Sequence, residues 1–403
     1  MSVISRLDLK GVFIRILPGL IVVIVIQSLA ISFVNVPIYG DSEEYMLLGK
    51  NIHDRGLYSF DGTNPSRMRQ PVYPTFLCLT YYSMGESFLV VKLIQAFAGL
   101  LTFLFTMCLF GLVCGSRHIR LASVCVGAYV PLWWNCAIIL SEPIAILLVA
   151  AFLLLLYGIT TRWSPGRCVA AGIFLGLAIL TRPIAIALLG LVWIPVVFNN
   201  QLKEKKIASL AVIVATCLVT LLPWTLRNYQ TFGKLTPLSA EGEYHAFRAA
   251  NFAAELPMDS IVTWEALRDK QSSGTLLTTI IDEVRLNPIN YIWNGIKRVF
   301  GSWIYFPGSR NFFDYVPARV TSYAAQSILL ILAAVGFYRF RNTERWFLIY
   351  PALSFSVVIF FSSEGISRLL LPVMPPVLIM IVIGIITLMK QFGNEPLEKG
   401  TVV

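Results

Sequence analysis

The sequence predicts an all-α polytopic membrane protein, and three observations lead to this fold class. Of its 403 residues, 57% are hydrophobic and only 13% are charged, whereas soluble proteins carry about 25% charged residues. The apolar residues form uninterrupted runs of about twenty, the length of a membrane-spanning helix, rather than amphipathic stripes. The short connections between several of these runs are basic.

The apolar runs divide into about ten transmembrane helices. The fifth and sixth are short and are separated by Thr181-Arg182-Pro183. Pro183 suits the first turn of a new helix, although by length alone the two runs could form one long broken span. The predicted spans cover residues 14–36, 87–113, 119–139, 142–160, 168–181, 183–198, 207–226, 321–338, 346–361 and 369–390.

Four short basic loops predict the orientation of these spans. By the positive-inside rule, the loops and both termini belong in the cytoplasm. The split at Arg182 brings all of them to the same side. We therefore expect a multi-pass inner-membrane protein whose net charge of +10 reflects topology and not a nucleic-acid partner. The basic loops are residues 115–120, 161–167, 203–206 and 339–345.

Three parts of the chain follow from this topology. Residues 1–226 form an N-terminal transmembrane module with a first external loop at 37–86, and residues 227–320 form a small external subdomain. Residues 321–403 hold the last spans and a short cytoplasmic tail. Segment 291–306 has aromatic residues on several faces around a basic pair, which is typical of an interfacial helix rather than a span.

The first external loop gathers carboxylates beside the membrane. If its start is helical, Asp41 and Tyr45 share a face, Glu44 lies beside them, and Glu43 points elsewhere. A partly desolvated carboxylate at a membrane surface can have a raised pKa and act as a base. The alternative is an ordinary acidic helix N-terminus, which the helix dipole favours.

Arginines add a complementary charge to the same external surface. Arg67 and Arg69 precede the stiffening Pro71, and guanidinium is the preferred protein partner of phosphate. Snorkelling towards lipid headgroups is the alternative. Arg227 with Asn228 ends the seventh span and is placed to bind a headgroup or to cap the helix.

Two charges lie close to the membrane core. Glu142 opens the fourth span before Pro143, either as a helix cap or as a second carboxylate that shares a substrate or a divalent cation with Asp41. Arg182 is expected to pair with Glu142 or Asp41, or to contact a phosphate. Arg368, at the start of the last span, faces the same side. The combined surface suits a substrate with an apolar tail, a phosphate and a sugar.

No cofactor is predicted, and a divalent cation stays an open alternative. His53, His118 and His245 are scattered, the seven cysteines show no C-x-x-C spacing, and the glycines form no phosphate loop. A nucleotide-sugar enzyme and an ATP-driven pump are therefore disfavoured.

The sequence resembles the GT-C-type glycosyltransferases that use polyprenyl-phosphate sugars, the group that contains the protein O-mannosyltransferases of family 39 and the lipid A aminoarabinose transferase. The order and spacing of the matching motifs resemble that family over nearly the whole chain. The motifs are Gly40-Asp-Ser-Glu-Glu-Tyr45, Asn51-Ile52 with Gly56-Leu-Tyr58, Arg69-Gln-Pro-Val-Tyr-Pro74, Leu180-Thr-Arg-Pro183, Pro223-Trp-Thr-Leu-Arg-Asn228 with Phe232-Gly233, and Arg368 with Leu371-Pro372.

The resemblance implies a GT-C fold in which Asp41 matches the catalytic aspartate and Tyr45 and Arg69 match positions near the donor phosphate. Arg69 stands where some members have lysine, and Val72 stands where the family often has glycine. The chain is shorter than the protein mannosyltransferases, and no extra soluble domain follows the last span. This favours a bacterial member of the group.

The expected function is inverting transfer of a sugar from an undecaprenyl-type phosphate to an external glycan, lipid or protein. Asp41 would accept the acceptor's proton. The expected donor-side residues are Tyr45, Arg69, Tyr73, Arg227 and Arg368, and the expected supporting or acceptor-side residues are Glu44, Glu142, Arg182 and Asn228.

Two alternatives to this function stay open. One is a flippase or transporter of lipid-linked sugars, a class marked by mid-membrane charge and internal repeats. The other is an O-antigen ligase or polymerase, which would use a lipid diphosphate oligosaccharide. The sequence names neither the sugar nor the acceptor.

Overall fold

The regular secondary structure in the described part of the chain is helical. The computed structural model describes residues 9–34, 40–193, 203–233, 235–242, 245–246, 249, 281–282, 284–304, 316–339, 346–362 and 367–392. Across these residues there is no β-strand, only an isolated bridge between Ser59 and Pro65. The predicted all-α membrane fold class is therefore confirmed.

Each of the ten predicted spans contains helix. Within the described residues, four single helices are long and apolar enough to cross a bilayer, and the 3-10 helix η5 together with α17 makes a fifth such stretch. The long ones are α1 (Leu9–Phe33), α4 (Phe88–Cys114), α7 (Glu142–Thr161), α10 (Lys203–Phe232), and η5 (Ser367–Val373) with α17 (Met374–Phe392). The shorter ones are α8 (Pro165–Ile179), η3 (Pro183–Trp193), α15 (Val316–Arg339) and α16 (Trp346–Phe361).

The predicted span 119–139 is not one continuous helix. It consists of α5 (Ile119–Gly127), α6 (Val130–Trp134) and the 3-10 turn η2 (Asn135–Ala137). Pro131 explains the break, because its ring would meet the carbonyl of Gly127, four residues earlier, in a continuing helix. Broken backbone at membrane depth is tolerated where protein buries it, and Trp133 here is 1% exposed and donates from Nε1 to the Val126 carbonyl at 3.1 Å.

The chain also breaks between the fifth and sixth predicted spans, as the sequence indicated. Helix α8 ends at Ile179, η3 begins at Pro183, and η3 packs against α8 and α16. The amide of Val72 donates to the carbonyl of Leu180 at 3.1 Å. This hydrogen bond ties the break, and with it Arg182, to the first external loop.

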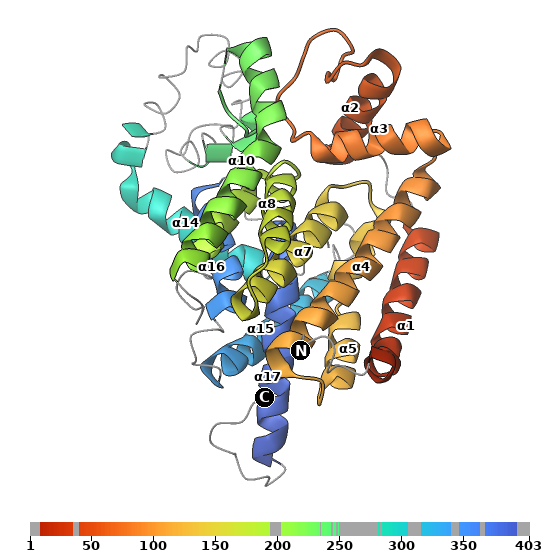
Figure 1. Cartoon of the computed structure of the whole chain (residues 1–403), viewed down its shortest axis with the longest axis vertical. Helices are drawn as coiled ribbons and strands as arrows, with labels where there is room; N and C mark the ends of the chain where they lie inside the picture. Colours follow the sequence, from red (N-terminus) through yellow and green to blue (C-terminus); the bar gives the residue numbers. More distant parts are fainter. Residues whose placement is uncertain are drawn as a thin grey trace.

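Two helices of the predicted first external loop pack against each other at one end of the molecule. They are α2 (Asp41–Arg55) and α3 (Val72–Met84). Figure 1 shows them at the end opposite the last turns of α17. Their close approach depends on Gly49, where a Cβ atom would lie 2.8 Å from the Leu77 Cβ. Which end faces the cytoplasm stays a prediction from the loop charges.

The predicted external segment 227–320 is described only in part. Helix α10 continues through residue 226 to Phe232, and α14 (Pro288–Ile304) covers most of the predicted interfacial helix. Helix α14 exposes Ile289, Trp293 and Phe300. Most of residues 243–280 lie outside the described part of the chain, so the predicted subdomain boundary stays a prediction.

Candidate active site

Arg69 is the centre of an ion-pair cluster. Its Nη2 lies 2.6 Å from Asp41 Oδ1, its Nε lies 2.6 Å from Glu44 Oε2, and its Nη1 pairs with Glu241. Its side chain is only 12% exposed. Asp41 is the first residue of α2 and Glu44 lies one turn along, so the predicted helical face is confirmed. Helix α2 thus presents two carboxylates to one guanidinium.

A second chain of ion pairs runs from Asp41 into the helix bundle. The other carboxylate oxygen of Asp41 pairs with Arg368, in η5. The Nε of Arg368 lies 3.6 Å from Glu142, which in turn lies 2.5 Å from the Nη1 of Arg182. The predicted pairing of Arg182 with Glu142 is confirmed. Arg368 thus lies between Asp41 and Glu142 and contacts both carboxylates.

Local structure explains how these side chains are held. Gly40, before α2, has φ of 60°, a conformation that glycine adopts at low cost. Asp41 and Glu44 then lie in the first helical turn, where the dipole stabilises carboxylates. Glu142 occupies the same position in α7 and is 1% exposed. A carboxylate so deeply buried requires a cationic partner, which Arg182 provides.

The two predicted tyrosines form a layer beside this cluster. The guanidinium of Arg69 lies 5.6 Å from the ring centre of Tyr45, whose hydroxyl contacts Ser141 Oγ at 3.2 Å. Tyr73 is fully buried, packs edge-on against Tyr45, and donates to Gln95 Oε1 at 2.6 Å. Tyr45 therefore borders the ion pairs, whereas Tyr73 lies behind it and supports its ring.

Arg227 lies in a different setting from the other predicted arginines. Its guanidinium carbon is 4.7–5.4 Å from the ring centres of Tyr58, Trp224 and Phe232. Asn228 accepts from Arg227 and donates to the carbonyl of Thr236 at 3.0 Å. The group connects to the cluster indirectly, because the Tyr58 hydroxyl donates to the carbonyl of Arg69 at 3.0 Å.

The arginines determine the charge state of Asp41. Burial raises the pKa of Asp41, but Arg368 and Arg69 together outweigh burial and lower that pKa to about 2. Burial alone suggested a raised pKa, and the structure reverses that direction. Asp41 is therefore ionised at neutral pH but is a weak base while both guanidinium contacts persist.

Glu241 belongs to this cluster, and sequence reasoning missed it. Burial raises its pKa, but Arg69 and His245 more than compensate and lower it. Glu241 lies 172 residues from Arg69 along the chain. In the sequence, Glu241 is marked only by its position among several polar residues after the Arg227-Asn228 motif. No periodic pattern relates Glu241 to the first loop.

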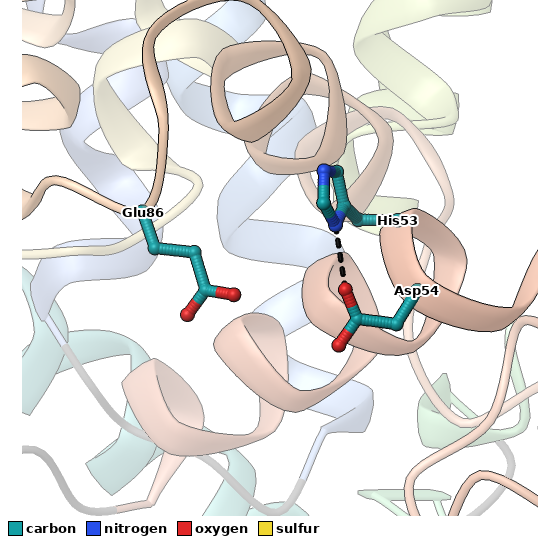
Figure 2. A group of neighbouring side chains, drawn as sticks. All are labelled: His53, Asp54 and Glu86. Carbon is teal, nitrogen blue, oxygen red and sulfur yellow. Dashed lines mark hydrogen bonds and ion pairs between the residues drawn. The ribbon is translucent and has the colours of Figure 1, made fainter.

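One further group of side chains has the composition of a metal site. Among the described residues, His53, Asp54 and Glu86 place three ligand atoms within 4.8 Å of one another (Figure 2). His53 Nδ1 lies 2.6 Å from Asp54, and Lys50 Nζ lies 2.8 Å from Glu86. Lys50 also lies 4.0 Å from Asp54, so these side chains join α2 to the connection before α4 as an ion-pair network.

Among known proteins, solved structures match this chain, but family models and curated sequences do not. The oligosaccharyltransferase of Archaeoglobus fulgidus in the apo form matches 97% of this chain and 52% of its own, with 14% identity and a TM-score of 0.58. The same organism's oligosaccharyltransferase AglB, in complex with an inhibitory peptide and a dolichol-phosphate, matches 94% of this chain and 51% of its own, with 14% identity and a TM-score of 0.53.

A third solved structure, ArnT from Cupriavidus metallidurans bound to undecaprenyl phosphate, covers 96% of this chain and 80% of its own at 15% identity, with a TM-score of 0.48. This chain spans about half the length of the oligosaccharyltransferases that it matches. At these identities the likeness establishes the fold. The described helices and the match over nearly the whole chain identify that fold as the GT-C membrane fold, as the sequence predicted.

Proposed function

We propose that this protein is an inverting glycosyltransferase that moves a sugar from a polyprenyl phosphate to an acceptor on the outer side of the membrane. The observation that carries the proposal is the convergence of Arg69 and Arg368 on Asp41. One carboxylate and two phosphate-binding groups thus meet at the end of an apolar helix bundle. The solved structure with a dolichol-phosphate shares this fold, which supports a lipid-linked donor.

In the proposed reaction, a lone pair of an acceptor hydroxyl or amine attacks the anomeric carbon. The bond from that carbon to the phosphate oxygen breaks, and its electron pair leaves with the polyprenyl phosphate. Asp41 takes the proton from the acceptor. Phosphate is a good leaving group, so cationic side chains suffice to stabilise its developing charge.

The guanidinium groups of Arg69 and Arg368 first stabilise the Asp41 carboxylate and then bind the donor phosphate in this mechanism. In the present state Arg69 and Arg368 lower the pKa of Asp41 to about 2. When a donor phosphate binds to these guanidinium groups, its negative charge offsets part of their positive charge, so the pKa of Asp41 rises and Asp41 becomes a stronger base. Donor binding would therefore activate the base only when a leaving group is present.

The remaining predicted residues take supporting places in this proposal. Glu142, which is itself paired with Arg182, contacts Arg368, and Glu44 and Tyr45 border Arg69. Arg227, surrounded by aromatic rings, is a donor-side group that is connected to the Arg69 cluster only indirectly, through Tyr58. A metal ion stays outside the proposal.

The test is transfer by purified protein from a panel of synthetic polyprenyl-phosphate sugars, with a membrane extract supplying the acceptor. Wild type should release free polyprenyl phosphate, whereas Asp41→Asn should be folded and inactive, with a loss of about a thousandfold or more. Glu43→Gln is the matched control, because Glu43 is an exposed carboxylate of the same helical turn.

Near-normal transfer by Asp41→Asn at normal expression would exclude Asp41 as the base. Movement of the lipid-linked sugar across vesicles without bond cleavage would favour a transporter. Transfer only from a lipid diphosphate oligosaccharide would favour a ligase or polymerase. Assays with lipid monophosphate sugars and lipid diphosphate oligosaccharides thus distinguish the glycosyltransferase, the transporter and the ligase or polymerase.

A further inference from the structure

The hydrogen-bonding edges of Arg69 are already occupied by carboxylates. Asp41 contacts Nη2, Glu44 contacts Nε, and Glu241 contacts Nη1. A guanidinium offers five N–H groups in a planar fork, and each of its three nitrogens here already faces a carboxylate. A phosphate that binds the remaining N–H groups of Arg69 lies beside three carboxylates, so its close approach is favoured when one of them leaves.

The net charge of the cluster around Arg69 also favours the departure of one carboxylate when a phosphate binds. Over the described residues, the connected cluster contains one more carboxylate than guanidinium, and an incoming phosphodiester adds a further negative charge. Like charges held close together in a partly desolvated site repel each other strongly. The members are Asp41, Glu44, Glu142 and Glu241, with Arg69, Arg182 and Arg368.

Two of the three carboxylates around Arg69 are poorly suited to leave. Asp41 and Glu44 lie in the first turn of α2, where the helix dipole stabilises them. Asp41 is also held by Arg368. If the side chain of Asp41 or Glu44 turned away from Arg69, it would still lie in the first turn of α2, close to the other carboxylate. The excess of negative charge beside Arg69 would therefore persist.

Glu241 differs from both in its attachment. Its neighbour Ala240 donates from the amide to the carbonyl of Arg67 at 2.9 Å, so the backbone is anchored beside the connecting segment that carries Arg69. The glutamate side chain, with three rotatable bonds, can turn away while this anchor remains. His245, 3.8 Å from the carboxylate, offers an alternative partner on the same segment.

Unsatisfied polar atoms flank the Arg69–Glu241 pair in sequence. The Gln70 Oε1 and Ser239 Oγ atoms are buried and have no hydrogen-bond partner among the described residues. Both residues are only 2% exposed. Buried polar groups without partners are costly, and they gain when a polar ligand or water enters. Ser239 thus places a buried polar atom two residues from Glu241, and Gln70 places one next to Arg69.

We propose that Glu241 is a competing carboxylate that occupies the phosphate-facing edge of Arg69 in the resting protein and is displaced by the donor phosphate. It sets the affinity for the donor and so favours lipids whose phosphate can outcompete a carboxylate. This inference rests on the proposed function, because it takes Arg69 to be a phosphate ligand. In this inference Glu241 weakens donor binding and takes no part in the chemical step.

The experiment measures binding of farnesyl phosphate, a short polyprenyl phosphate without sugar, to purified full-length protein by calorimetry. Glu241→Gln, which keeps the size and loses the charge, should bind about tenfold more tightly than wild type, and Glu241→Ala at least as tightly. In the transfer assay, Glu241→Gln should lower KM for the donor while kcat changes little. Glu43→Gln is the matched control and should bind as wild type does.

Each other outcome overturns the inference. Equal tightening by Glu43→Gln would reveal a general charge effect, and unchanged binding by Glu241→Gln and Glu241→Ala would show no competition. Weaker binding by both folded variants would mean that Glu241 positions Arg69 for the phosphate. If wild type transfers sugar and Asp41→Asn does not, the proposed function stands even when this inference fails. If no variant binds the phosphate or transfers sugar, both fail together.

Discussion

Asp41 is held by arginines from two distant parts of the chain. It begins α2, accepts from Arg69 and Arg368, and has a pKa of about 2. A carboxylate held by two guanidinium groups stabilises the fold while it is ionised. The same residue is therefore a structural link in the resting protein and the proposed base during turnover.

This double role predicts a pH-dependent contribution to stability. The pKa of Asp41 lies below its ordinary value of 3.8, so the contribution is complete above that value and is lost as pH falls towards 2. The shift corresponds to about 2 kcal/mol. The difference in Tm between wild type and Asp41→Asn should stay constant from about pH 7 to about pH 5 and shrink below about pH 4.

Thermal unfolding of both proteins in one detergent checks this expectation. All other carboxylates titrate in both proteins, so the difference isolates Asp41. A difference that grows as pH falls would show that the pKa of Asp41 is raised in the folded protein.

At the scale of elements, the packing of α2 against α3 sets the geometry of the ion pairs. Helix α2 carries Asp41 and Glu44, whereas Arg69 lies in the connection that leads into α3. The two helices approach each other closely at Gly49. A change in this contact therefore alters the distance from the carboxylates to the guanidinium.

Gly49→Ala is expected to lower kcat/KM by about tenfold while leaving the helical content unchanged. Its Cβ atom would lie 2.8 Å from the Leu77 Cβ and 3.3 Å from the Pro74 carbonyl, so α2 must shift away from α3. Gly166→Ala is the control, because its Cβ atom meets only the Ser164 Oγ, at 3.9 Å. Steady-state transfer assays on both variants make the comparison, and equal activities would contradict the expected coupling.

At the scale of the whole molecule, one network of ion pairs connects the first external loop to the last span. It passes from α2 through Arg368 to Glu142 at the start of α7 and Arg182 at the break after α8. Charges this close to a membrane core are stable only when they are paired. The network therefore fixes how the N-terminal and C-terminal helices meet.

Glu142→Gln is expected to destabilise the protein by about 3–5 kcal/mol, because it leaves Arg182 buried without its carboxylate. The double variant Glu142→Gln with Arg182→Met removes both charges and should recover part of the lost Tm. Thermal unfolding in detergent compares the two variants with wild type. A double variant less stable than Glu142→Gln would show that Arg182 is stabilised by other partners.

The sequence determined the features that depend on neighbours along the chain. Apolar runs and loop charge predicted the membrane helices, and the helical repeat put Asp41, Glu44 and Tyr45 on one face. The break at Arg182 followed from Pro183. The break before Pro131 depends on an equally local rule, although the apolar run across it suggested one span.

Only the tertiary structure decided which distant charges meet. Arg368 reaches Asp41 across 327 residues and Glu241 reaches Arg69 across 172. It also placed Tyr73 behind Tyr45 and surrounded Arg227 with aromatic rings. No local pattern encodes such pairings, because they arise from helix packing that brings several segments to one end of the bundle. The sign of the Asp41 pKa shift follows from that convergence, since burial and arginine contacts act in opposite directions and only their distances determine which prevails.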